Sequence, residues 1–139
     1  MRDQASKLSW LRKDRVISGF LNLDLNFATT VYLGIYNGDK YIADRIKELE
    51  NQTSQDFYLI VTDNCSPEFK LDFVENQLQS SSLFANRYLI IQNPVNLGSV
   101  GSFRLNLDLV PSPWITFFHQ DDKYLPNHMA VHLNAINLA

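Results

Sequence analysis

Two adjacent carboxylates, Asp121 and Asp122, follow a short apolar run in the stretch "ITFFHQDDKYLP" (115–126). Successive side chains of an extended chain point to opposite sides, so the two carboxylates should diverge unless the chain turns there. One could then reach into a cleft while the other caps the following turn. Carboxylate oxygens are ligands for hard divalent cations, which also bind phosphate oxygens. The alternative is that both acids solvate a turn and cap a helix near Pro126.

Polar residues also follow three other apolar runs, at 35–38, 63–66 and 93–98. Asp63 and Asn64 combine acceptors with a donor, the combination that recognises the edge of a nucleobase, although both residues also favour turns. Asn96 and Gly98 belong to a segment that could present backbone amides to an anion or could simply begin a helix. His119 could bind a metal or a phosphate, or could be bonded to neighbouring backbone.

The elements that carry these groups alternate along the chain. Four short runs rich in β-branched and aromatic residues predict strands buried on both faces: Thr29–Ile35, Phe57–Thr62, Tyr88–Gln92 and Trp114–Phe118. Apolar residues at helical spacing predict helices over 39–51, over 67–79 with Ser66 as N-cap and Pro67 at the first position, over 99–110, and from Pro126 onward.

This alternation predicts an α/β fold with a mainly parallel sheet of about four strands and helices on both faces. In such sheets ligands bind beyond the carboxyl ends of the strands. We therefore expect the polar groups that follow the four strands to meet at one edge. In particular, Asp63 and Asp121 should converge on a single crevice.

Composition limits the function classes. The chain has 139 residues, of which 45% are hydrophobic, which fits one domain with a packed core. A formal net charge of −3 gives no general attraction to nucleic acid. Residues 1–15 hold five basic and two acidic residues, and we interpret 1–28 as a partly helical N-terminal extension. Cys65 is the only cysteine and no apolar run approaches the length of a membrane span, so we expect a cytoplasmic protein.

Four blocks in this order resemble the N-terminal part of family 2 glycosyltransferases with the GT-A fold. In that family a first strand ends in a Pro-x-Tyr-Asn-like turn, a helix ends near Asn-Gln-Thr, and Asp-Phe opens a strand ending in Asp-Asp-Gly-Ser. The segment "VYLGIYNGDKYIADRIKELENQTSQDFYLIVTDNCSPE" (31–68) is similar to this pattern. "NPVNLGSVGSF" (93–103) resembles the family's Asn-x-Gly-x-x-Gly segment, and "WITFFHQDDKYLPNH" (114–128) resembles its Asp-x-Asp-Asp strand before Leu-Pro.

The resemblance, over about residues 30–138, implies a Rossmann-like GT-A domain that binds a nucleoside diphosphate sugar with Mn²⁺ or Mg²⁺. A cation held by an aspartate stabilises the charge that develops on the leaving diphosphate. By position Asp121 is the implied metal ligand, with His119 as a second candidate. The implied donor-binding residues are Ile35, Tyr36, Asn37, Asp63, Asn64, Asn96, Gly98, Gln120 and Asp121.

The chain departs from the family pattern at three places: His119 stands for the first acid, Gly34 stands where proline is usual, and Asn64 replaces an acid. The family's acceptor-binding half, with its catalytic base, corresponds to sequence beyond residue 139. We therefore expect 29–139 to be the donor-binding part of a metal-dependent, inverting enzyme of polysaccharide biosynthesis, truncated before that half. Its acceptor would be a glycan or a lipid-linked sugar.

The alternative is a non-catalytic nucleotide-binding or interaction module of the same fold. For either function we expect no nucleic-acid partner. Membrane contact, at the inner face, would come only through the basic N-terminus or through regions outside this chain.

Overall fold

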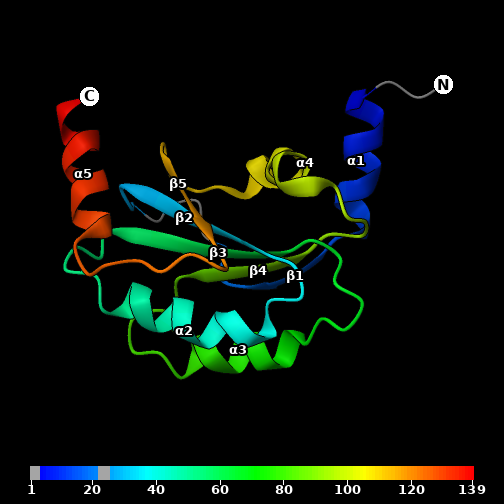
Figure 1. The fold of residues 1–139 in the computed structure, drawn as a ribbon. Helices are drawn as coiled ribbons and strands as arrows, with labels where there is room; N and C mark the ends of the chain where they lie inside the picture. Colours follow the sequence, from blue (N-terminus) through cyan, green and yellow to red (C-terminus); the bar gives the residue numbers. More distant parts are fainter. Residues whose placement is uncertain (1–3, 22–25) are drawn as a thin grey trace.

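The computed structural model describes residues 4–21 and 26–139, with the backbone alone at 4–6. Its centre is a sheet of five strands in the order β1-β4-β3-β2-β5 (Figure 1). The strands are β1 (Val16–Gly19), β2 (Thr29–Ile35), β3 (Phe57–Asp63), β4 (Tyr88–Gln92) and β5 (Ile115–His119). The pairs β2–β3, β2–β5 and β3–β4 are parallel, and β1 runs antiparallel to β4. The predicted mainly parallel sheet is therefore confirmed.

The fifth strand, β1, was not predicted. It has only four residues, and its Val16 and Ile17 are exposed, so the run is too short to show a strand period. It forms by pairing with the free edge of β4, with Val16 opposite Gln92. A pairing between residues so far apart in the sequence leaves no local signal.

Helices lie on both faces of the sheet, as predicted (Figure 1). Helices α2 and α3 cover one face, α4 lies over the other, α1 lies beside α4, and α5 stands at the far end of the molecule. Their bounds are α1 (Gln4–Asp14), α2 (Asp39–Glu50), α3 (Leu71–Gln79), α4 (Gly98–Asn106) and α5 (His128–Leu138), and a 3-10 turn, η1 (Leu107–Leu109), follows α4. No helix among residues 4–21 and 26–139 is long and apolar enough to cross a membrane.

The predicted start of α3 at Pro67, capped by Ser66, is wrong. The Ser66 hydroxyl donates to Asp63 Oδ1 at 2.5 Å and accepts the backbone N–H of Asn37, so it is not available as a cap. The chain turns after Ser66, and the helix begins at Leu71. The predicted start of the last helix at Pro126 is likewise two residues early, because Pro126 and Asn127 form a turn.

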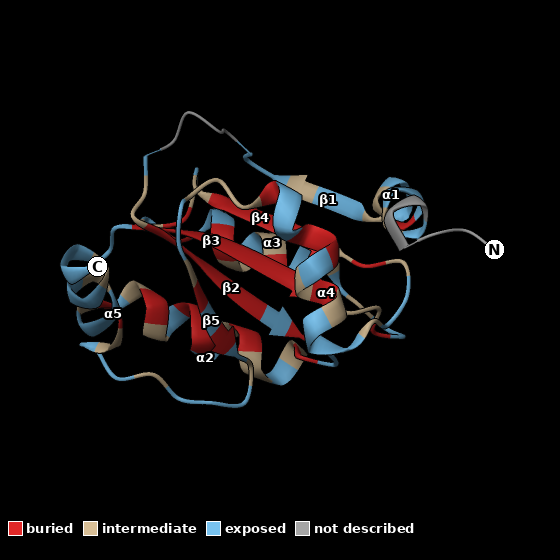
Figure 2. Cartoon of the chain, turned by 90° about the horizontal axis from the view of Figure 1, so that it is seen from above, coloured by how far each residue is buried: buried red, intermediate tan, exposed pale blue. Residues whose placement is uncertain are grey.

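Side chains of the central strands alternate between two cores, one on each face of the sheet. Leu33, Leu59 and Ile90 pack under α2 and α3. Tyr32 and Ile60 pack on the opposite face, which α4 and η1 cover. Burial is concentrated in the three central strands, whereas β1 and most of α5 are exposed (Figure 2). The parity of a strand residue therefore decides which face its side chain joins.

Candidate functional site

A cleft of about 240 Å³ opens on the α4 side of the sheet, at the carboxyl ends of the parallel strands. This is the edge at which open α/β sheets bind ligands. Five of the predicted site residues line it together with His119. The lining residues are Tyr32, Gly34, Ile35, Tyr36, Thr62, Asn64, Ser99, Ser102, Phe117, Phe118, His119, Gln120 and Asp121.

The floor of the cleft includes one row of paired residues across three strands. Gly34 on β2 is in register with Thr62 on β3 and with His119 on β5. Gly34 has no side chain, and a Cβ built there would have no neighbour within 4 Å, so this position keeps the floor open. Partners in a parallel ladder point to the same face, which explains why all three residues line the cleft.

Thr62 is the residue of this row that sequence reasoning missed. It is fully buried, and its Oγ1 has no hydrogen-bond partner among the described residues. A buried hydroxyl without a partner costs about 1–3 kcal/mol, so this position is unfavourable within the chain as it stands. Its place one residue before Asp63 puts it on the opposite face of the same strand, but a continuous apolar run does not show which face opens on the cleft.

Gln120 bridges the ends of β2 and β5. Its Oε1 accepts the backbone N–H of Tyr36 at 2.8 Å, and its Nε2 donates to the Tyr36 carbonyl at 2.9 Å. The Gln120 carbonyl in turn accepts Arg45 Nη1 at 2.8 Å, and the buried Arg45 is ion-paired with Glu48. Gln120 thus holds the Tyr36 backbone beside the cleft, and the Tyr36 side chain, 41% exposed, stays available to a ligand.

The two carboxylates of the opening motif lie in a turn and not in an extended chain. Both are exposed, but Asp121 lines the cleft and Asp122 does not. The chain turns at this point, because Asp122 donates its backbone N–H to the His119 carbonyl at 3.3 Å. Tyr124 fixes the same corner by accepting the His119 backbone N–H at 2.6 Å.

These residues fit a divalent cation only together with ligand oxygens. Among the described residues no group of three or more His, Cys, Asp or Glu side chains could hold a metal. Asp121 and His119 supply a carboxylate and an imidazole to the same cleft, and a hard cation needs about six ligands. Water and the oxygens of a bound diphosphate are the groups that could complete such a set.

Asp63 does not line the cleft, although β3 and β5 both flank β2 and end at the same edge. Asp63 is fully buried and is paired with Ile35, one residue after the pair of Thr62 and Gly34. Ile35 belongs to the core under α2 and α3, so Asp63 lies on that face of the sheet and not on the cleft face. Its Oδ2 accepts the Ser66 N–H at 2.9 Å and its Oδ1 accepts the Ser66 hydroxyl. In the structure, therefore, Asp63 shapes the turn behind the cleft wall.

Asn64 and Asn96 are engaged with each other. Asn64 donates from Nδ2 to Asn96 Oδ1 at 3.0 Å, and its own Oδ1 accepts the side chain of Asn93 and the backbone N–H of Leu97. Asn96 Oδ1 also accepts the N–H of Gly98, which has a positive φ of 70°. These asparagines fix the start of α4, so that Ser99 and Ser102 line the cleft. Sequence reasoning did not identify either serine.

Besides Asp63, three predicted donor-binding residues lie outside the lining: Asn37, Asn96 and Gly98. Asn37 has a positive φ of 50° and donates its backbone N–H to Ser66 at 2.8 Å. Asn37 lies just after β2, Asn96 lies between β4 and α4, and Gly98 is the first residue of α4.

Comparison with known proteins identifies the family. The family model described as glycosyl transferase family 2 matches residues 30–138. The chain belongs to glycosyl transferase family 2. It is 28% identical over 98 residues to an uncharacterized glycosyltransferase of Haemophilus influenzae, and 28% identical over 102 residues to another of Methanocaldococcus jannaschii. The matches cover 70% and 72% of this chain, but only 29% and 34% of those two glycosyltransferases.

Solved glycosyltransferase structures share the fold. S. aureus TarS 1–349 in complex with UDP-GlcNAc superposes with a TM-score of 0.66 at 23% identity, covering 81% of this chain and 32% of TarS 1–349. The mannosyltransferase PcManGT of Pyrobaculum calidifontis, in complex with GDP-Man and Mn²⁺, gives a TM-score of 0.68 at 12% identity, covering 96% of this chain and 38% of that enzyme. The GT-A fold expected for a family 2 glycosyltransferase is therefore confirmed.

Proposed function

We propose that the cleft binds a nucleoside diphosphate sugar and that this family 2 domain supplies the donor site for transfer of the sugar. The observation that carries the proposal is the row of Thr62, Gly34 and His119, which places an unpartnered buried hydroxyl on the floor of a cleft that ends at the Asp121 carboxylate. The ligands named for TarS and PcManGT, UDP-GlcNAc and GDP-Man, are of this class.

In this proposal the residues have separate tasks. Tyr36, held by Gln120, contacts the base or ribose. Thr62, whose hydroxyl has no partner within the described chain, forms a hydrogen bond with the ligand. Asn64, Asn96 and Gly98 order the start of α4 beside the diphosphate, and the positive end of the helix dipole favours that anion. Asp63 and Asn37 hold the turn that carries Tyr36.

Asp121, with His119, would hold Mn²⁺ or Mg²⁺ against the diphosphate, and the cation would neutralise charge on the leaving group. We further propose that the sugar is transferred to a glycan or a lipid-linked acceptor with inversion of the anomeric carbon. We assign the catalytic base to no residue of this chain.

Thermal-shift titration tests the proposal. UDP, dTDP or GDP with Mn²⁺ should raise the midpoint of unfolding, because a ligand at 100 times its dissociation constant adds about 2.7 kcal/mol of stability. In the variant D121N the metal-dependent part of the shift should disappear. D122N is the matched control, since Asp122 is the exposed neighbour outside the cleft. No shift with any nucleotide, or equal losses in D121N and D122N, would overturn the proposal.

A further inference from the structure

The N-terminal extension contacts the wall of the cleft from outside the family region. The family match begins at residue 30, so α1 and β1 are additional to it. Helix α1 nevertheless lies beside α4, the helix whose first turns line the cleft. The contacts between α1 and α4 therefore connect a segment outside the family match to the candidate donor site.

Two arginines of the extension form hydrogen bonds with the C-terminal end of α4. Arg12 Nε donates to the Leu105 carbonyl at 3.1 Å, and Arg15 Nη1 donates to the same carbonyl at 3.2 Å. Arg15 also forms a forked pair with Asp108, with N–O distances of 2.9 and 2.8 Å. Its side chain is only 7% exposed. Carbonyls at a helix end lack partners within the helix, and positive charge is stabilising there.

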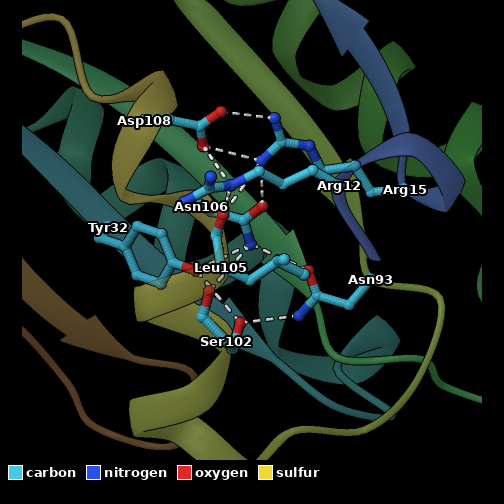
Figure 3. A network of polar contacts seen from close by, with 8 residues as sticks. All are labelled: Arg12, Arg15, Tyr32, Asn93, Ser102, Leu105, Asn106 and Asp108. Atoms are coloured by element: carbon cyan, nitrogen blue, oxygen red, sulfur yellow. Dashed lines mark hydrogen bonds and ion pairs between the residues drawn. The ribbon is translucent and has the colours of Figure 1, made fainter. Parts of the chain in front are cut away.

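A polar network continues from these arginine contacts toward the cleft (Figure 3). Arg15 Nη1 donates to Asn106 Oδ1 at 3.0 Å, and Asn106 Nδ2 donates to Asn93 Oδ1 at 2.9 Å. Asn93 Nδ2 then donates to Ser102 Oγ at 2.8 Å and to Asn64 Oδ1 at 3.1 Å. Both Ser102 and Asn64 line the cleft.

The buried side chains of this network cannot exchange their partners for water. Asn93 and Asn106 are buried, with 1% and 0% of their surface exposed, so a lost partner is not replaced by solvent. Ser102 is held a second time by the Tyr32 hydroxyl at 3.1 Å, from the floor of the cleft. Asn106 and Asn93 therefore link Arg15 by hydrogen bonds to Ser102 and Asn64 in the cleft wall.

We propose that the extension is a brace for the donor site and that Arg15 is a positioning residue for nucleotide binding, acting through Asn106 and Asn93. This inference rests on the proposed function. It predicts that loss of Arg15 weakens binding in a cleft that Arg15 does not line. The expected loss is about five- to tenfold in affinity, the lower range of coupling between separate sites.

The test compares R15A with K13A, which removes a positive charge from the last turn of α1, two residues before Arg15, at an exposed position. Nucleotide affinity is measured by calorimetry with Mn²⁺, below the unfolding midpoint of each variant. R15A should bind nucleotide about five- to tenfold more weakly, and K13A should match the wild type. R15K keeps the positive charge but cannot form the two parallel hydrogen bonds to Asp108, so it should recover part of the lost affinity. Unchanged affinity in R15A, even with a lowered unfolding midpoint, would overturn the inference.

Hydrogen exchange of the free protein separates this inference from the proposed function. In the free protein, R15A should increase exchange in 93–106 as well as in α1. If exchange rises only within α1, the brace is wrong even when nucleotide binds. If wild type binds no nucleotide while exchange in 93–106 still rises, the donor-site proposal and the role of Arg15 in binding fail together, and only the mechanical coupling stands.

Discussion

Thr62 gives the sharpest prediction at the scale of single residues. Its buried hydroxyl has no partner in the described part of the chain, so the variant T62V, which keeps the shape and removes the polar group, should be as stable as wild type or up to about 1 kcal/mol more stable. The same change should weaken nucleotide binding, because the floor of the cleft loses its donor and acceptor. Chemical denaturation and calorimetry measure the two effects.

Thr116 supplies the matched control for T62V. Its hydroxyl lies 3.0 Å from that of Thr29, and both residues are buried. T116V should therefore be destabilised, since it leaves the Thr29 hydroxyl unpaired, and its nucleotide affinity should stay unchanged. If T62V lost stability as T116V does, Thr62 would be a packing residue with no role in the cleft.

Gly38 allows a second prediction at this scale. A Cβ at this position would lie 2.9 Å from Ile35 Cβ and 2.7 Å from Gln120 Oε1, the atom that accepts the Tyr36 N–H. G38A should lose about 1–3 kcal/mol of unfolding free energy, as overpacked sites do, and should displace Gln120 from Tyr36. G34A, where a Cβ meets nothing within 4 Å, should keep its stability. Equal stability of G38A and wild type in denaturant titrations would contradict this.

The pKa of Asp108 reports on the Arg15 contact. The hydrogen bond from Arg15 lowers the pKa of the Asp108 carboxyl below its ordinary value of 3.8, and the charges of Arg15 and Arg12 act in the same direction. Because the folded pKa is lowered, the stabilisation is present at neutral pH and is lost as the pH falls below that ordinary value. In R15A the pKa should return upward, which an NMR titration of the carboxyl carbon measures. An unchanged titration midpoint would show that the pair does not form in solution.

At the scale of elements, the position of α5 depends on Gln52, part of the Asn-Gln-Thr block. Its Nε2 donates to the Leu125 carbonyl at 2.9 Å, and its Oε1 accepts the Met129 backbone N–H at 2.8 Å. The buried amide thus ties the end of α2 to the segment that follows Asp121 and to the first turn of α5. This contact gives a physical reason for a polar block at the end of an otherwise amphipathic helix.

A pH-dependent contact lies at the same helix start. Burial lowers the pKa of His128 below its ordinary value of 6.5, and the neighbouring His132 lowers it further. The neutral imidazole packs against the rings of Phe118 and Tyr124, with centroid distances of 5.1 and 4.9 Å. Stability from this contact is present above pH 6.5 and is lost as the pH falls through the lowered pKa. H132A should raise the His128 midpoint in NMR titrations, and N134A, an exposed change on the same helix, should leave it unchanged.

The four parallel strands and the sheet edge that carries the candidate site were predictable from sequence, and the orientation of individual groups was not. Runs such as Phe57–Val61 are apolar on both faces, so their composition alone indicates buried parallel strands. The face of each residue depends on a parity that a continuous apolar run does not display. For that reason Asp63 was expected in the cleft where Thr62 lies, and the brace from Arg15, whose partners are some 90 positions away, gave no signal.

For the molecule as a whole, burial separates a core from two peripheral helices. Every residue of β3, the middle strand of the sheet, is buried, and β3 is paired on both sides. In α5, Met129 is the single buried residue, and among the described side chains of α1 only Leu11 is buried (Figure 2). Opening either helix exposes little apolar surface, whereas breaking β3 exposes both cores.

Native-state hydrogen exchange should therefore show separate openings. Amides of β3 should exchange only by global unfolding, so their opening free energy should fall steeply with denaturant. Amides of α5 should exchange through a local opening that low denaturant hardly changes, because little surface is exposed. Amides of α1 should behave like those of α5 in R15A but be better protected in wild type, where Arg12 and Arg15 bind the end of α4. A common denaturant slope for β3 and α5 would mean that the chain opens as one cooperative unit, and α5 would then contribute to the core despite its exposure.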